Sequence, residues 1–167
     1  MGAPSSSGPP LSASPLFLRE SEVRRGIELL YFGYGNLTRS VDQGLASHGL
    51  GRAHHRVLYF VARQPDLTVS ELLGLLAITK QSLGRVLGDL TERALVEMRP
   101  GERDRRQRLL RLTPAGQVLE AELFDTVRTR LSAAYASAGQ NAVGGFWAVL
   151  EGLIPGDDKA RIAALRD

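Results

Sequence analysis

The chain has 167 residues, a net charge of +3 at pH 7 and no cysteine. This length is enough for one domain of ordinary size with a hydrophobic core. The absence of cysteine excludes disulfides, thiol nucleophiles and zinc sites built on thiolates. No run of 18 apolar residues occurs in the sequence, so we expect no transmembrane helix and no membrane partner.

The N-terminal residues 1–16 are expected to form a disordered tail. The first fifteen residues contain four Pro, five Ser and two Gly, a composition that buries little apolar surface. They lack the basic and apolar regions of a secretory signal. Structure is therefore expected to begin near Phe17.

Residues 17–50 are predicted to hold a long helix over 17–47, because apolar residues recur at spacings of three and four. Gly33 and Gly35 interrupt this pattern and are expected to kink the helix or to permit close packing. An apolar stripe with no partner nearby in sequence suggests a dimer interface, and packing on its own domain is the alternative. The residues of the stripe are Ile27, Leu30, Tyr31, Tyr34, Leu37, Val41 and Leu45.

Residues 51–112 are predicted to form a separate lobe that begins with two helices. The first spans 52–63, is interrupted at 64–66 by a proline, and turns Ala53, Val57, Leu58 and Val61 inward. Thr68 and Glu71 have the spacing of a capping box, which starts a short second helix. The apolar face of that second helix consists of Leu72, Leu73 and Leu76.

A third helix of this lobe is predicted over 80–93, with Thr79 as its N-cap. One face is apolar and the opposite face is polar, the latter carrying Gln81, Ser82, Arg85 and Asp89. Two helices joined by a short turn, the second with a polar outer face, are typical of a helix-turn-helix. Ala94 stands at the helix exit, where glycine is commoner.

The two short apolar runs at 95–99 and 107–112 are predicted to pair as the strands of a wing. Between Arg99 and Arg111 there are six arginines and two acids, so this segment carries 6 − 2 = +4 against +3 for the whole chain. A basic hairpin directly after a helix-turn-helix is suited to contact phosphates. The sequence therefore predicts double-stranded DNA as the partner.

Residues 113–167 are predicted to form C-terminal dimerisation helices. Thr113 and Pro114 have the residue types of an N-cap and a first helical position, and Gly139 separates the first long helix from the next. Pro155-Gly156 ends the second helix, and one further turn is expected through Ile162 and Leu165. The first apolar stripe consists of Val118, Leu119, Leu123, Val127, Leu131 and Ala134, and the second of Val143, Phe146, Trp147 and Leu150.

This order of elements resembles the MarR family of bacterial transcription regulators. Three pieces carry the resemblance, and it extends over about residues 17–154. They are Val69-Ser70-Glu71-Leu72 through Ile78-Thr79-Lys80-Gln81-Ser82-Leu83, then Leu90-Thr91-Glu92-Arg93-Ala94-Leu95-Val96, and Arg103-Asp104-Arg105-Arg106 followed by Leu112-Thr113-Pro114-Ala115-Gly116. Ala94 departs from the glycine that is usual in the family.

The resemblance implies a mainly α fold with a small β wing, in which the terminal helices of two subunits intertwine. It implies that the major groove is contacted by Thr79, Lys80, Gln81, Ser82 and Arg85. It also implies that Asp104 and Arg106 form the Asp-x-Arg of the wing, with the arginine in the minor groove and the aspartate holding it. Arg103 and Arg105 complete the predicted DNA-binding set.

The resemblance further implies a pocket for a small effector, often an aromatic acid, between the dimer helices and the DNA-binding lobe. The candidate residues are Tyr31, Tyr34, His54, Arg56 and Phe60, and ordinary packing is the alternative for each. The histidines are His48, His54 and His55. Consecutive residues on a helix diverge by about 100°, so His54 and His55 are poorly placed to share one metal ion, and no metal or cofactor is predicted.

The sequence contains no phosphate-binding loop, metalloprotease motif or nucleophile elbow, so no catalytic residue and no enzymatic activity are predicted. The function predicted is that of a cytoplasmic, homodimeric, sequence-specific regulator, most often a ligand-responsive repressor, on a pseudo-palindromic operator. The alternative is an architectural protein that binds DNA without sequence preference. The ratio of specific to non-specific affinity separates the two.

Overall fold

The computed structural model describes residues 19–102 and 104–165. The chain forms two compact units, one before Leu37 and one from Leu37 onward. The tail predicted over 1–16 lies outside the described residues, as does Arg103. None of the helices in the described part combines the length and apolarity needed to cross a bilayer.

Helix α1 (Glu20–Arg39) is amphipathic but buries none of its residues. Acids in its first turn and Arg39 in its last turn match the direction of the helix dipole. The helix continues through Gly33 and Gly35 and ends earlier than predicted. Its exposed apolar side chains are Val23, Ile27, Leu29, Leu30, Tyr31, Phe32 and Tyr34.

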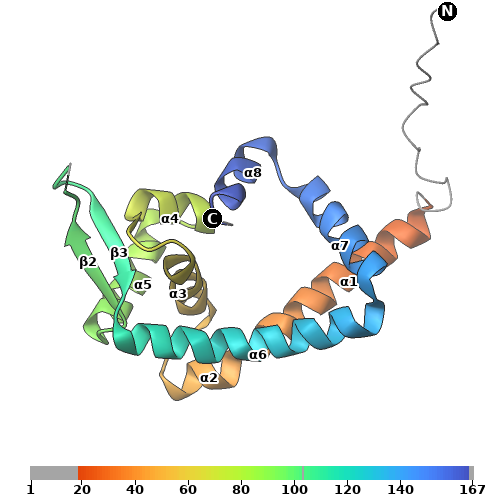
Figure 1. The fold of residues 1–167 in the computed structure, drawn as a ribbon, viewed down its shortest axis with the longest axis horizontal. Coiled ribbons are helices and arrows are strands. Elements are labelled where there is room, and N and C mark those ends of the chain that lie inside the picture. Colours follow the sequence, from red (N-terminus) through yellow and green to blue (C-terminus); the bar gives the residue numbers. More distant parts are fainter. Residues whose placement is uncertain (1–18, 103, 166–167) are drawn as a thin grey trace, which may run out of the picture. The chain divides into compact units, whose positions relative to one another are not determined.

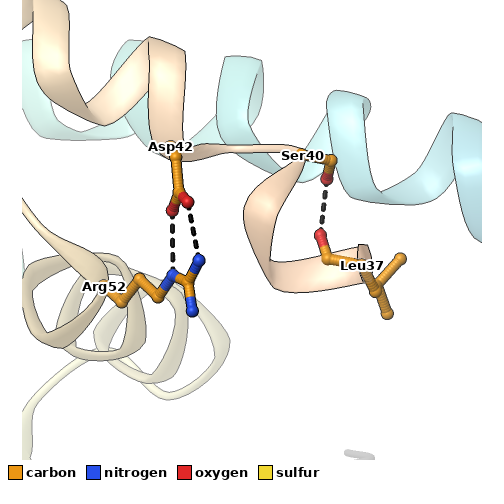
Figure 2. Close-up of polar contacts among 4 residues, drawn as sticks. All are labelled: Leu37, Ser40, Asp42 and Arg52. Carbon is orange, nitrogen blue, oxygen red and sulfur yellow. Dashed lines mark hydrogen bonds and ion pairs between the residues drawn. The ribbon is translucent and has the colours of Figure 1, made fainter. Parts of the chain in front are cut away.

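A break at Ser40 and Val41 corrects the prediction of one helix over 17–47. The Ser40 hydroxyl donates to the carbonyl of Leu37 at 2.6 Å (Figure 2), and such bonds compete with the helical pattern and bend it. Val41 turns into the core, with 1% of its surface exposed. A separate helix α2 (Asp42–Ser47) follows.

An ion pair ties α2 to the next helix. Nε of Arg52 donates to Oδ1 of Asp42 at 2.9 Å, and a terminal guanidinium nitrogen donates to Oδ2 at 2.6 Å (Figure 2). The Arg52 guanidinium lowers the pKa of Asp42, chiefly through this hydrogen bonding. Apolar contacts add to the ion pair, because Leu45 and Leu50 are also buried.

The lobe that follows consists of α3 (Arg52–Arg63), α4 (Val69–Leu76), α5 (Lys80–Glu92) and a small sheet. The antiparallel sheet has the order β1 (Leu67–Thr68), β3 (Arg108–Leu112), β2 (Val96–Pro100). Leu110 lies opposite Leu67 on one side and Met98 on the other. Figure 1 shows the β2–β3 hairpin extending from the lobe near α4 and α5.

The core of the lobe confirms most of the predicted apolar faces. Burial of this apolar surface is the main term that stabilises the lobe. Ala53 is exposed, contrary to the prediction that it points inward, and β1 was not predicted because it is only two residues long. The buried residues contributed by these elements are Val57, Leu58, Val61, Leu67, Leu72, Leu76, Leu83, Val86, Leu87, Leu90, Leu95, Val96, Leu110 and Leu112.

The C-terminal segment forms α6 (Pro114–Ala138), α7 (Gln140–Leu153) and α8 (Gly156–Ala163). Gly139 joins the first two helices with a φ of +84°, which glycine adopts without steric cost. In α6, Leu119 and Leu123 of the predicted apolar stripe are buried, whereas Val118 of the same stripe is 61% exposed. No described residue of α7 is buried.

Helix α8 is longer than the single turn predicted, and it lies against the lobe. A guanidinium nitrogen of Arg63, at the end of α3, donates to the carbonyl of Leu165. A Cβ placed on Gly74 of α4 would lie 3.5 Å from the guanidinium carbon of Arg161. A cleft of about 340 Å³ lies between α4 and α8.

Candidate nucleic-acid interface

The start of α5 is fixed by its own capping residue. The Thr79 hydroxyl accepts the backbone N–H of Ser82 at 3.1 Å and donates to the Ser82 side-chain oxygen at 2.9 Å. This pair confirms Thr79 as the N-cap. It satisfies one of the N–H groups that the first helical turn leaves without a partner.

The turn between α4 and α5 is held from behind by α3. A guanidinium nitrogen of Arg56 donates to the carbonyl of Leu76 at 2.8 Å, at the end of α4. Ala77 then reverses the chain with a left-handed φ of +52°. On the inner side of α5, Leu83 and Leu90 are almost fully buried, so the orientation of the helix is set by the core.

This packing leaves the opposite face of α5 open to solvent. Lys80, Gln81, Ser82 and Arg85 are all exposed. In the part of the chain that the structure describes, neither Lys80 nor Arg85 forms an ion pair. An arginine and a glutamine one helical turn apart, both unshielded, have the donors and acceptors that base edges in a major groove accept.

The tip of the wing is a tight turn built around Asp104. Its Oδ1 accepts the backbone N–H of Arg106 at 3.0 Å, and its carbonyl accepts the N–H of Gln107 at 3.0 Å. Gly101 donates its N–H to the carbonyl of Gln107 at 3.1 Å. A Cβ on Gly101 would lie 2.7 Å from the carbonyl oxygen of Asp104, so only glycine fits here. The aspartate thus fixes the backbone that presents Arg106.

The structure divides the arginines of the wing into two groups. Arg99 pairs with Glu97 at 2.5 Å, and Arg111 pairs with Asp66. The second group consists of Arg105, Arg106 and Arg108, which are all exposed. None of these three arginines forms an ion pair with a residue that the structure describes. In the sequence, all six arginines between Arg99 and Arg111 belong to one charged segment. Only the fold shows which of them are paired with an acid and which are available to contact a ligand.

Arg108 was left out of the predicted site, although the structure places it with the available cations. It opens β3 opposite Pro100, at the end of the ladder nearest the tip. Arg108 shares a strand face with buried Leu110, since residues two apart point to the same side, but it lies at the last pair of the ladder and is exposed there. Arg103, which was included, lies outside the described residues.

The residues predicted to line an effector pocket fall in both compact units. Tyr31 and Tyr34 lie on α1 and are largely exposed. On α3, Arg56 binds the carbonyl of Leu76, and the Phe60 ring packs edge-on against Tyr59 with centroids 5.4 Å apart. Because the two units are separate, a joint pocket stays a prediction.

Both ring nitrogens of His54 are engaged within the lobe. Nδ1 accepts the backbone N–H of Gly51 at 3.0 Å, and Nε2 lies 3.2 Å from Oδ2 of Asp89 on α5. His55, the next residue, is half-buried, and desolvation lowers its pKa. His48 is exposed, and its carbonyl accepts a hydrogen bond from Arg93 at 2.8 Å.

A helix-turn-helix whose second helix exposes polar side chains beside a basic, turn-stabilised hairpin defines a winged-helix DNA-binding protein. The profile of the MarR family matches residues 48–107, which cover α3, α4, α5 and most of the wing. The HTH-type transcriptional regulator PetP of Rhodobacter capsulatus is 45% identical over 160 residues, 96% of each chain. The chain therefore belongs to the MarR family of transcriptional regulators.

Solved structures of the same fold agree with this assignment. A cysteine-to-serine variant of E. coli MarR, complexed with operator DNA, matches with a TM-score of 0.65 and 22% identity, over 85% of this chain and 100% of that one. BpsR of Bordetella bronchiseptica, described with regulation of DNA binding by 6-hydroxynicotinic acid, matches with a TM-score of 0.62 and 20% identity, over 77% and 98% of the two chains. At these identities the likeness shows the fold.

Proposed function

We propose that this chain is a ligand-responsive repressor that binds a pseudo-palindromic operator as a homodimer. The observation that carries the proposal is the exposed face of α5, with Lys80, Gln81 and Arg85, beside a wing with three arginines that the described residues leave without an ion pair. Its site of action is the cytoplasm, where the DNA lies, and it performs no catalysis.

Within this proposal, the helix reads sequence and the wing supplies affinity. Gln81 and Arg85 have side chains that pair with base edges in the major groove. Arg105 and Arg106 lie on a hairpin suited to the minor groove, where the field is strongly negative and the base pattern is degenerate. Asp104 acts by fixing the turn below Arg106, as its 3.0 Å bond to that residue's N–H supports.

The terminal helices supply the dimer interface. Helix α1 has no buried residue, and large apolar side chains of α7 are also open to solvent, including Phe146, Trp147, Val149 and Leu153. Apolar patches of this kind on a folded chain mark surfaces that bind another protein surface. A symmetric dimer then matches a palindromic site whose half-sites lie about one helical turn, ~10 bp, apart.

The regulation proposed is by a small, anionic or aromatic effector. BpsR has a similar fold, and its DNA binding is described as regulated by 6-hydroxynicotinic acid, which supports this class of ligand. The candidate contacts are Tyr31, Tyr34, His54, Arg56 and Phe60. Such a ligand releases DNA only by favouring a dimer geometry in which the two recognition helices fit the operator worse.

Selection from a random duplex library tests this function. The full-length chain is expected to enrich a palindrome with two half-sites, and light scattering of the same sample is expected to give the mass of a dimer. Enrichment without any common sequence would instead favour the architectural alternative, because such a protein binds all duplexes with similar affinity. A monomeric mass at micromolar concentration would contradict the proposed dimer.

A further inference from the structure

The imidazole of His54 links the start of α3 to the recognition helix. Nδ1 accepts the N–H of Gly51 at 3.0 Å, so in the neutral ring the proton resides on Nε2. Nε2 therefore donates to the carboxylate of Asp89, at 3.2 Å. The His54 side chain is only 15% exposed, and both of its polar atoms are used, so the ring is held in one orientation.

Asp89 has a second potential partner on its own helix. Arg85 lies four residues earlier on α5, and side chains at this spacing are neighbours on the helix surface. No hydrogen bond or ion pair joins Arg85 to any residue that the structure describes. The Asp89 side chain is 47% exposed, so it can turn toward Arg85 if His54 does not hold it.

Pairing between Arg85 and Asp89 would work against binding to DNA. The guanidinium would lose its free donors, and its charge would be neutralised next to the phosphates. We propose that His54 is a positioning residue of the DNA-binding surface: it holds Asp89 on the side of α3 and so leaves Arg85 free to contact DNA. This inference rests on the proposed function, because it assumes that Arg85 contacts DNA.

Two variants of His54 separate this role from simple support of α3. His54→Phe keeps a ring of similar size but loses both polar contacts. His54→Gln keeps an acceptor for the N–H of Gly51 at a helical position that favours Gln, and it keeps an amide donor for Asp89. Asp89→Asn removes the competing anion, and the double variant of His54→Phe with Asp89→Asn completes a thermodynamic cycle.

Affinity for the selected duplex is measured by fluorescence anisotropy at low salt and well below the unfolding temperature. His54→Phe is expected to weaken binding about two- to fivefold for a dimer, since an exposed pair at this spacing is weak and occurs twice. His54→Gln is expected to bind within about twofold of the unmodified chain. Asp89→Asn is expected to bind the duplex at least as tightly as the unmodified chain. Adding His54→Phe to Asp89→Asn, or to Arg85→Ala, is expected to cause no further loss of affinity.

Equal weakening by His54→Phe with and without Asp89 would overturn the inference, because a role confined to the start of α3 does not depend on that carboxylate. Unchanged affinity of His54→Phe would overturn it as well. Failure of the unmodified chain to form any specific complex would instead contradict the proposed function, and this inference with it. That failure is recognised in the first binding curve, before any variant is compared.

Discussion

Gly116 of α6 lies directly on the carbonyl group of Leu95: a Cβ at Gly116 would stand 2.0 Å from the Leu95 oxygen. Thr113 strengthens the same junction, because its N–H donates to the Leu95 carbonyl at 3.1 Å and its hydroxyl to the carbonyl of Ala94 at 2.6 Å. The long helix is thus anchored where α5 ends and the wing begins. A displacement of α6 must therefore move the DNA-binding elements with it.

Gly116→Ala is expected to destabilise the chain by about 2 kcal/mol or more, because backbone atoms rather than a flexible side chain occupy the space of the new methyl group. Denaturant unfolding measures the change. Gly84→Ala on α5 is the matched control. A Cβ there meets nothing within 4 Å, so alanine should stabilise the helix by about 0.5–1 kcal/mol. Equal stability of the two variants would contradict the close contact at Gly116.

The local elements of the lobe follow from sequence because their signals lie within a few residues. The capping box of Thr68 and Glu71, the cap at Thr79 and the apolar face of α5 are all as predicted. The break at Ser40 was missed because apolar periodicity continues through Val41 and Leu45. That break depends on a side-chain hydrogen bond and on the pair of Asp42 with Arg52, which hydrophobic spacing does not report.

The candidate DNA-binding residues show the same limit. The excess of positive charge predicted the position of the wing, but it did not distinguish paired arginines from unpaired ones. Which arginines are available depends on Glu97 and Asp66, and Asp66 lies far from Arg111 in sequence. The contact of His54 with Asp89 likewise joins residues 35 positions apart, and such pairs depend on the packing of α3 against α5.

Ala94→Gly is expected to stabilise the chain by about 0.5–1 kcal/mol. Ala94 has a φ of +53°, and its N–H and that of Leu95 close the end of α5 onto Thr91 and Leu90 at 3.0 and 2.9 Å. This is a Schellman motif, in which glycine is favoured at the left-handed position. Ala121→Gly, in the exposed interior of α6, should have the opposite sign, and thermal unfolding of both variants distinguishes them.

Stability is expected to fall as the pH decreases through the titration of His55. Burial lowers the pKa of His55 below the ordinary value for histidine of 6.5, so the unfolded chain binds this proton more readily than the folded one. The stability that depends on a neutral His55 is present in full above the pKa of the unfolded chain, and it is lost as the pH falls through the pKa of the folded chain. The free energy of unfolding, measured with denaturant between about pH 8 and about pH 5, should fall less for His55→Phe than for the unmodified chain. Parallel curves for the two proteins would contradict the assignment.

Gly74→Leu is expected to release α8 from the lobe. A Cβ at Gly74 has ordinary contact distance to the Arg161 guanidinium, 3.5 Å, so a branched side chain must displace it. Hydrogen exchange should become faster over Gly156–Ala163 and remain unchanged over α5. Gly74→Ala is the matched control and should leave α8 protected. Unchanged exchange in the leucine variant would show that α8 does not depend on this contact.

The central claim, that α5 reads sequence while the wing supplies affinity, is tested most directly by comparing Arg85→Ala with Arg106→Ala. Binding is measured on cognate and scrambled duplexes at several salt concentrations. Arg85→Ala should cost about 1–3 kcal/mol on the cognate duplex and relax preference at one base pair per half-site. Arg99 lies in the same wing as Arg106 but is paired with Glu97 at 2.5 Å. Arg99→Ala is therefore the control for Arg106→Ala and should weaken binding less than Arg106→Ala does.

Arg106→Ala should weaken binding to both duplexes to a similar extent. It should also lower the slope of log affinity against log salt by about one per wing, or about two per dimer, because each lost cation releases one counterion fewer. A salt slope and an affinity that Arg106→Ala leaves unchanged would show that the wing does not touch DNA and would contradict the proposed division of roles.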